Sequence, residues 1–299
     1  MIIDIHAHIT YGRFPEFSTL LGRKPFTADI LLKRMDMEGI DKSVLLPLIS
    51  PECLDFYGVC GNQECIEAAR KHPDRFIAFC NIDPRSMMNS DDNSIMRLIK
   101  VYQEFGCKGI GEMCASLWID DIRYQRLFHN AGESGMPIIF HFKPEGSNSY
   151  GAIDDPGLPR FERMVKMFPK TIFAGHAPCF WNEISADVTA ENRACYVKGK
   201  IEKKGRLWTM FAENRNLYGD ISAGSAHCAL SRDPEKGYEF LEKFNSQVVF
   251  GTDRFTSADE PVPPILGFLK NGLTEGSLSP EAYENIMHRN TERILSVHA

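Results

Sequence analysis

The sequence predicts an α/β fold, a (β/α)8 TIM barrel whose metal site lies at the carboxyl-terminal ends of the strands. Eight short apolar stretches, rich in β-branched residues, mostly alternate with helical segments, a pattern that favours a parallel sheet. Five of these stretches end in a histidine or a carboxylate, and strand ends of this kind converge in a barrel. A doubly wound open sheet is the rival fold, but it would not bring the five ends to one centre as easily.

The predicted elements follow one another along the chain with short connections. Strands are expected at residues 2–5, 43–47, 76–81, 106–112, 137–141, 170–175, 216–221 and 247–252. Helices are expected at residues 29–37, 61–71, 91–105, 121–134, 158–168, 235–244, 261–271 and 280–296. Thr27 suits the N-cap of the first helix, and Gly39 and Gly135 suit helix ends.

The whole chain, residues 1–299, is predicted to form a single domain. Residues 177–215, after the sixth strand, exceed a normal connection and are expected to form a longer, helical insertion. Residues 9–26 and 143–157 are rich in Gly and Pro and are expected to form loops, the first of them above the site.

The composition is that of an ordinary protein with one large core. The 299 residues are 43% hydrophobic and 25% charged, with a net charge of −6 and no long basic run, so no nucleic-acid-binding surface is evident. No apolar run approaches the ~20 residues of a membrane helix, and no secretory leader is recognised. Nine cysteines without a C-x-x-C pair fit reduced thiols, and we expect a cytoplasmic protein.

The first strand leads directly into the sequence His-x-His. Side chains two residues apart point to the same face of a strand, so His6 and His8 project together and can share one metal ion. Such a pair alone also occurs by chance and is often structural.

Four later strands also end in residues that ligate metals: Glu112, His141, His176 and Asp253. Imidazole and carboxylate together suit Zn²⁺, Mn²⁺ or Fe²⁺. Each residue has a plainer alternative: a salt-bridge partner for Glu112, a core histidine for His141, and an N-cap for Asp253. The joint pattern favours one or two divalent metals, with zinc first and manganese or iron as alternatives.

Several nearby residues are weaker candidates for binding a substrate. Asp220 and Ser222 end the seventh strand and could contact a substrate or simply bond within their turn. Arg254 could bind a substrate carboxylate or form a surface salt bridge, and Trp181 could line the pocket or pack in the core. Asp4 shares a face with His6 and could orient a ligand histidine.

The sequence resembles the amidohydrolase superfamily, and within it the amidohydrolase-2 group of metal-dependent hydrolases and decarboxylases. The resemblance rests on Asp-x-His-x-His, Gly-Glu, His, Gly-His and Gly-Thr-Asp in this order, and it covers nearly the whole chain. It implies a (β/α)8 barrel that holds one or two divalent metals, and a possible homo-oligomer.

The resemblance also implies individual roles. His6, His8, His141 and Asp253 match metal ligands of the family, and His176 matches its strand-six histidine. The strand-four position carries Glu112 where other members have a carboxylated lysine, which keeps a bridged pair of metals possible. In members with one metal, His176 would instead polarise substrate or water.

We therefore expect a metal-dependent hydrolase that acts on a small, carboxylated molecule with metal-activated water. In this hypothesis Asp253 moves the proton and His176 stabilises developing charge. Two alternatives remain open: a non-oxidative decarboxylase on the same barrel, and a non-catalytic barrel whose metal is structural.

Overall fold

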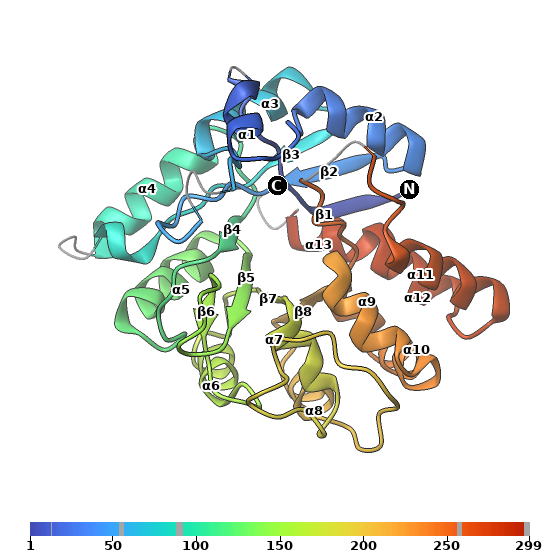
Figure 1. The fold of residues 1–299 in the computed structure, drawn as a ribbon. Helices are drawn as coiled ribbons and strands as arrows, with labels where there is room; N and C mark the ends of the chain where they lie inside the picture. Colours follow the sequence, from blue (N-terminus) through green and yellow to red (C-terminus); the bar gives the residue numbers. More distant parts are fainter. Residues whose placement is uncertain (13, 54–56, 88–91, 256–258, 296–299) are drawn as a thin grey trace.

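The computed structural model describes residues 1–12, 14–53, 57–87, 92–255 and 259–295, and it shows a ring of parallel strands surrounded by helices (Figure 1). The predicted α/β barrel is thus confirmed. Residues 91 and 296, at the ends of two predicted helices, and residue 13, in a predicted loop, lie outside the described residues.

All eight predicted strands are present, and the differences are confined to their bounds. They are β1 (Ile3–Ala7), β2 (Lys42–Leu45), β3 (Phe76–Ala78), β4 (Ile110–Met113), β5 (Ile138–Lys143), β7 (Phe173–His176), β8 (Leu217–Asp220) and β9 (Val248–Val249). Regular pairing is shorter than predicted in β9, although the following residues still bond to β1.

Two parallel sheets close into one ring. One sheet has the order β1-β2-β3 and the other β4-β5-β7-β8-β9. A parallel bridge between Cys80 and Ile110 joins β3 to β4. At the opposite seam the Ile5 N–H donates to Phe250 O at 2.9 Å, and a bridge joins Ala7 to Arg254. The strand ends therefore face one point, as the barrel hypothesis requires.

Helices cover the outside of the ring in the order expected of βα units. They are α2 (Ala28–Glu38), α3 (Asn62–Lys71), α4 (Asp92–Glu104), α5 (Ile122–Ser134), α6 (Pro159–Met167), α8 (Arg206–Glu213), α9 (Ala223–Ser231), α10 (Pro234–Lys243), α11 (Pro264–Glu275), α12 (Pro280–Glu284) and α13 (Asn290–Leu295). The predicted helix ends at Gly39 and Gly135 are confirmed, since both residues adopt the left-handed conformation.

The core has two layers. Inside the ring, Ile5, Val44, Phe79 and Val249 pack with other inward-facing strand residues, and α13 adds Ile294 at the amino-terminal end of the barrel. A larger cluster fills the space between the strands and the surrounding helices. Because the barrel is filled and closed at this end, the opposite end is the open one, where the histidine-bearing strands finish.

The connections differ from the prediction in three places. The expected helical insertion at 177–215 is helical at α7 (Pro178–Trp181), at the following 3-10 turn Asn182–Ile184 and at α8, while residues 185–205 form turns and irregular segments. The loop at 143–157 contains a short strand, β6 (Ala152–Ile153), beside β5, and the loop at 9–26 contains α1 (Pro15–Leu20).

A buried arginine ties the irregular part of the insertion to neighbouring segments. Arg193 is 2% exposed and donates to the carbonyl oxygens of Asp154 and Cys179. The guanidinium thus satisfies two carbonyl oxygens that are far apart in the sequence.

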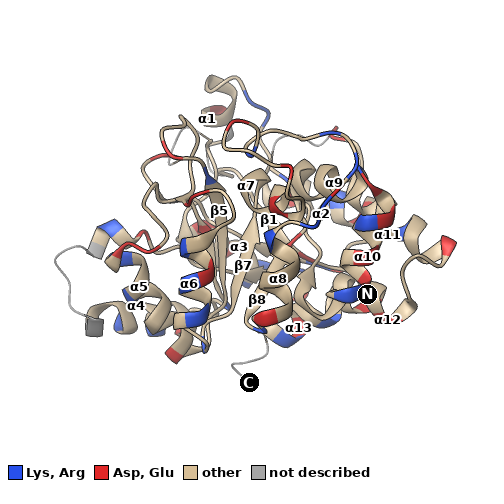
Figure 2. Ribbon diagram, turned by 90° about the horizontal axis from the view of Figure 1, so that it is seen from below, with Lys and Arg blue, Asp and Glu red and all other residues tan. Residues whose placement is uncertain are grey.

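Charged residues of both signs occur on the outside of the fold. Lys, Arg, Asp and Glu are interspersed on the helices in Figure 2. None of the helices in the described ranges has the length and apolarity that crossing a membrane would require.

Candidate metal centre

β1 delivers the first two candidate ligands to the open end of the barrel. His6 and His8 are both buried, at 0% and 2% exposure, and lie on the same face of the strand as the alternation predicts. Their Nε2 atoms lie 3.1 Å apart.

The other ring nitrogen of each histidine fixes its tautomer. His6 Nδ1 lies 2.6 Å from a carboxylate oxygen of Asp220, and His8 Nδ1 lies 2.6 Å from Leu46 O. Carboxylate and carbonyl oxygens only accept, so both Nδ1 atoms carry the hydrogen. In the neutral rings, two Nε2 lone pairs then face each other, which is unfavourable unless a cation lies between them. The two Nε2 atoms are therefore suited to ligate a metal ion.

Two carboxylates complete this set of donors. Glu112 Oε2 lies 3.7 Å from His6 Nε2 and 3.5 Å from His8 Nε2. Asp253 Oδ1 lies 3.5 Å and 3.4 Å from the same two atoms. Ligand atoms ~2.1 Å from one tetrahedral metal are about 3.4 Å apart, so each carboxylate oxygen lies close to this spacing from both imidazole nitrogens.

The second oxygen of Glu112 faces another pair of histidines. Oε1 lies 2.8 Å from His141 Nδ1 and 4.0 Å from His176 Nε2. His176 Nε2 also lies 3.7 Å from Asp253 Oδ2. The six predicted residues thus form three overlapping groups, each able to hold an ion: His6, His176 and Asp253; His6, His8 and Glu112; Glu112, His141 and His176.

Asp253 reaches the centre through an unusual backbone conformation. Its φ is +55°, in the left-handed region that side chains other than Asn and Asp rarely adopt. Its N–H donates to His6 O at 2.7 Å, which fixes the turn against β1. The side chain is 21% exposed, compared with 2% for Glu112, so Asp253 is the carboxylate on the solvent side.

Asp220 and Ser222 lie beside the histidines, out of contact with solvent. Both are completely buried, and the Ser222 N–H donates to the second Asp220 oxygen at 3.0 Å. Ser222 Oγ lies 3.2 Å from His6 Nδ1 and 3.0 Å from His176 Nδ1. The structure therefore places these two residues against the histidine rings rather than in a substrate cavity.

Gly251 explains how β8 reaches β1, although β9 lies between them in the ring. A Cβ at Gly251 would lie 2.8 Å from Asp220 Oδ1 and 3.1 Å from His6 Cβ. Only glycine leaves the space through which the Asp220 carboxylate meets the His6 ring.

The carboxylates shift the titration of the histidines. Burial alone would lower the pKa of His6, but Asp220 and Asp253 outweigh it and raise that pKa well above its usual range. Burial is likewise outweighed at His8, where Asp253 and Glu112 raise the pKa to about 9. Burial lowers the pKa of His176. Without a metal, protons thus compensate the negative charge that the carboxylates bring to the centre.

Glu112 and Asp253 remain ionised. Burial opposes this, but hydrogen bonds from His141, His6 and His8 hold the pKa of Glu112 well below its usual value. Neighbouring imidazoles lower the pKa of Asp253 in the same way, against its burial. The donor set is therefore anionic, as a divalent cation requires.

Arg254 and Trp181 do not face the donors. The Arg254 guanidinium pairs with Glu38 and Glu260, and because it is only 5% exposed this is not the surface pair considered above. The Trp181 indole N–H donates to Asp220 O at 2.7 Å, and its ring is buried. These contacts brace the elements around the centre.

Asp4 supports the backbone rather than a ligand ring. Its Oδ1 accepts from the His6 N–H at 3.0 Å and from the Thr252 N–H at 2.9 Å. Burial raises the pKa of this carboxyl to about 7. Asp220 instead makes the contact to the His6 ring.

Three aromatic residues beside the centre were not among the site residues predicted from the sequence. The Tyr150 ring lies 4.4 Å from the His141 ring, and the Phe255 ring lies 5.9 Å from the His8 ring. Tyr57 contacts both, with ring centroids 5.2 Å from Tyr150 and 6.2 Å from Phe255. These residues come from three different loops, so no local sequence pattern predicts their contact.

Solved structures with this fold are enzymes in several cases. The chain matches 5-carboxyvanillate decarboxylase from Sphingomonas paucimobilis at 17% identity and a TM-score of 0.61, over 99% of this chain and 98% of the other. It matches a probable 2-pyrone-4,6-dicarboxylic acid hydrolase from Acinetobacter baumannii at 11% and 0.60, over 99% of both chains. An amidohydrolase from Burkholderia multivorans matches at 11% and 0.59, also over 99% of both.

The chain shares the barrel fold of these three proteins. The predicted resemblance is thereby confirmed at the level of the fold. No family model matches the sequence, and no curated protein matches it.

Proposed function

We propose that this protein is a metal-dependent hydrolase that acts on a small, carboxylated molecule. The proposal rests on the convergence of His6, His8, Glu112, His141 and Asp253 at the open end of an amidohydrolase-type barrel. Zinc suits these nitrogen and oxygen donors best, with manganese or iron as alternatives.

The observation that carries the proposal is the position of Glu112 between two histidine pairs. One of its oxygens faces His6 and His8, and the other faces His141 and His176. A carboxylate in this position suits a bridge between two ions. Two ions supply a water that ionises near neutral pH and polarise the bond that it attacks.

The side chains of the centre have separable tasks in this reaction. Asp253 is the most exposed carboxylate and accepts the proton of the attacking water. Burial lowers the pKa of His176, and this imidazole stabilises the charge that develops on the substrate. Asp220 holds His6 in the tautomer whose Nε2 is free to ligate.

Replacement of Glu112 tests the bridge. Glu112→Gln keeps the shape but removes the charge, so we expect the metal content of protein purified without chelator to fall from two ions per chain to one or none. The matched control is Glu133→Gln, an exposed glutamate that pairs with Lys170 on the outside of α5. Unchanged stoichiometry in Glu112→Gln, with the same result in the control, would reject the bridging role.

The aromatic group favours a second candidate, a non-oxidative decarboxylase. Tyr150, Phe255 and Tyr57 offer ring faces and edges beside the histidines, and these suit a planar aromatic acid. The similar decarboxylase acts, by its name, on 5-carboxyvanillate, which is such an acid. A single ion per chain and release of CO2 without uptake of water would favour this reaction over hydrolysis.

A further inference from the structure

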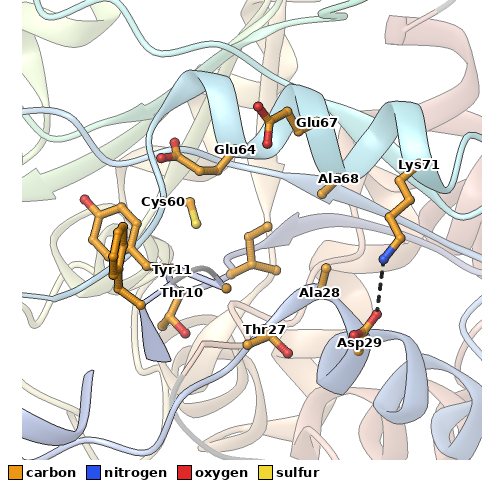
Figure 3. A pocket seen from close by; sticks show the side chains of 13 residues that line it. Thr10, Tyr11, Thr27, Ala28, Asp29, Cys60, Glu64, Glu67, Ala68 and Lys71 are labelled. Atoms are coloured by element: carbon orange, nitrogen blue, oxygen red, sulfur yellow. Dashed lines mark ion pairs between the residues drawn. The ribbon is translucent and has the colours of Figure 1, made fainter. Parts of the chain in front are cut away.

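A cavity lies on the outer side of the barrel, and it is separate from the residues of the metal centre. It has a volume of about 450 Å³ and lies between the start of α2, α3 and the segment that follows β1 (Figure 3). None of the candidate metal ligands lines it. Its size is within the range of small-molecule sites in proteins.

The floor and one end of the cavity are apolar. Ile9, Cys60 and Ala68 form the floor, and all three are at least nine-tenths buried. Tyr11 and Phe14 form one end, and Phe14 keeps 62% of its surface exposed. A ligand with a short apolar or aromatic body would cover surface that is otherwise in contact with water.

One cationic and three acidic side chains line the cavity. Lys71 and Asp29 lie 4.0 Å apart across the opening and offset each other, as the dashed line in Figure 3 marks. Glu64 and Glu67 follow one another by three residues on α3, so both lie on the side of the helix that borders the cavity.

Glu64 lies in the first turn of α3 and lines the cavity. Figure 3 shows its carboxylate beside Cys60, and burial together with the Glu64 charge raises the pKa of that thiol to about 12. In the described part of the chain, no residue forms an ion pair or a hydrogen bond with the Glu64 side chain. A partly buried carboxylate without a counter-ion, close to aromatic rings, is a receptor for a cation.

We propose that this cavity binds a small organic cation, a primary ammonium group on a short apolar or aromatic body. The ammonium group pairs with Glu64, and the body packs on the floor against Ala68 and Tyr11. The proposal is independent of the metal chemistry, because it uses no residue of that centre.

Titration calorimetry of the full chain with phenethylamine tests the proposal, with 2-phenylethanol as the uncharged analogue. We expect the amine to bind and the alcohol to bind at least about tenfold more weakly, since only the ammonium group can pair with Glu64. Glu64→Gln should weaken amine binding about tenfold and leave the alcohol unaffected.

Two further variants control for folding and for position. Glu235→Gln, which changes an exposed glutamate in the first turn of α10, should leave amine binding unchanged. Ala68→Leu should fill the floor and abolish binding without a change in charge. Each variant is checked by its thermal unfolding and metal content.

Equal affinity for amine and alcohol, equal effects of the two glutamate variants, or no binding of the amine would each overturn the proposal. Loss of the metal function alone would leave amine binding intact, so the two proposals fail separately.

Discussion

The Nε2 atoms of His6 and His8 face each other at 3.1 Å, while each Nδ1 atom is committed to an acceptor, Asp220 or Leu46 O. This arrangement orients two lone pairs toward one point at the open end of the barrel. A proton or a metal ion must compensate them, and the anionic Glu112 and Asp253 nearby favour the doubly charged ion.

His8→Ala should remove most of the bound metal. The substitution removes one of two nitrogen donors and leaves Leu46 O without its partner, so we expect the metal content to fall at least about tenfold. Elemental analysis of protein purified without chelator measures it. His129→Ala on the exposed face of α5 is the control, and equal metal content in both variants would contradict the assignment.

Asp220→Asn should weaken metal binding without removing a ligand. Loss of the charge beside His6 Nδ1 makes the imidazole a poorer donor and no longer fixes its tautomer, so affinity should fall about 10- to 100-fold. Competition with a chromophoric chelator measures this. Affinity equal to that of the unchanged chain would mean that Asp220 has no positioning role.

Gly251→Ala should lower both the stability of the barrel and its affinity for the metal. The new Cβ would lie 2.8 Å from both Asp220 Oδ1 and Ser222 Cβ, so we expect a loss of about 1–3 kcal/mol in the free energy of unfolding and weaker metal binding. Urea unfolding measures the first effect. Gly267→Ala is the control, because Gly267 lies on the exposed face of α11 and its new Cβ would meet nothing within 4 Å. This substitution should be neutral or stabilising. A stabilised Gly251→Ala protein would contradict the packing argument.

As the pH rises, the stability of the metal-free protein should fall, whereas its apparent affinity for the metal should increase. The pKa of His8 is raised to about 9, so the stability that its charge contributes is complete below pH ~6.5 and disappears as the pH rises through about 9. Metal binding displaces that proton, so apparent metal affinity should increase over the same interval. Chelator competition and urea unfolding at pH 6.5, 7.5 and 8.5 measure both trends, and a flat affinity profile would show that His8 does not lose a proton on binding.

The ring of strands and the candidate ligands at the strand ends could be predicted from the sequence. Alternation within residues 2–8 places His6 and His8 on one face, and this local rule holds in β1. Glu112, His141, His176 and Asp253 follow the same logic, since each lies at or near the carboxyl end of an apolar strand and barrel strands converge.

Contacts that depend on several strands or loops at once were beyond a sequence-based prediction. Asp220 meets His6 only because Gly251, two residues beyond the strand between them, has no side chain. Tyr150 and Phe255 reach the histidines from loops whose course no periodicity specifies. The insertion was expected to be helical, but residues 185–205 are turns and irregular segments, in which the buried Arg193 bonds to Asp154 O and Cys179 O.

Metal stoichiometry per chain tests the central claim most directly. Elemental analysis of the unchanged protein, purified without chelator and again after reconstitution with zinc, should give two ions per chain if Glu112 bridges them. One ion would favour the decarboxylase candidate with His6, His8, His141 and Asp253 as ligands. No bound metal, even after reconstitution, would contradict the account and leave only the barrel fold.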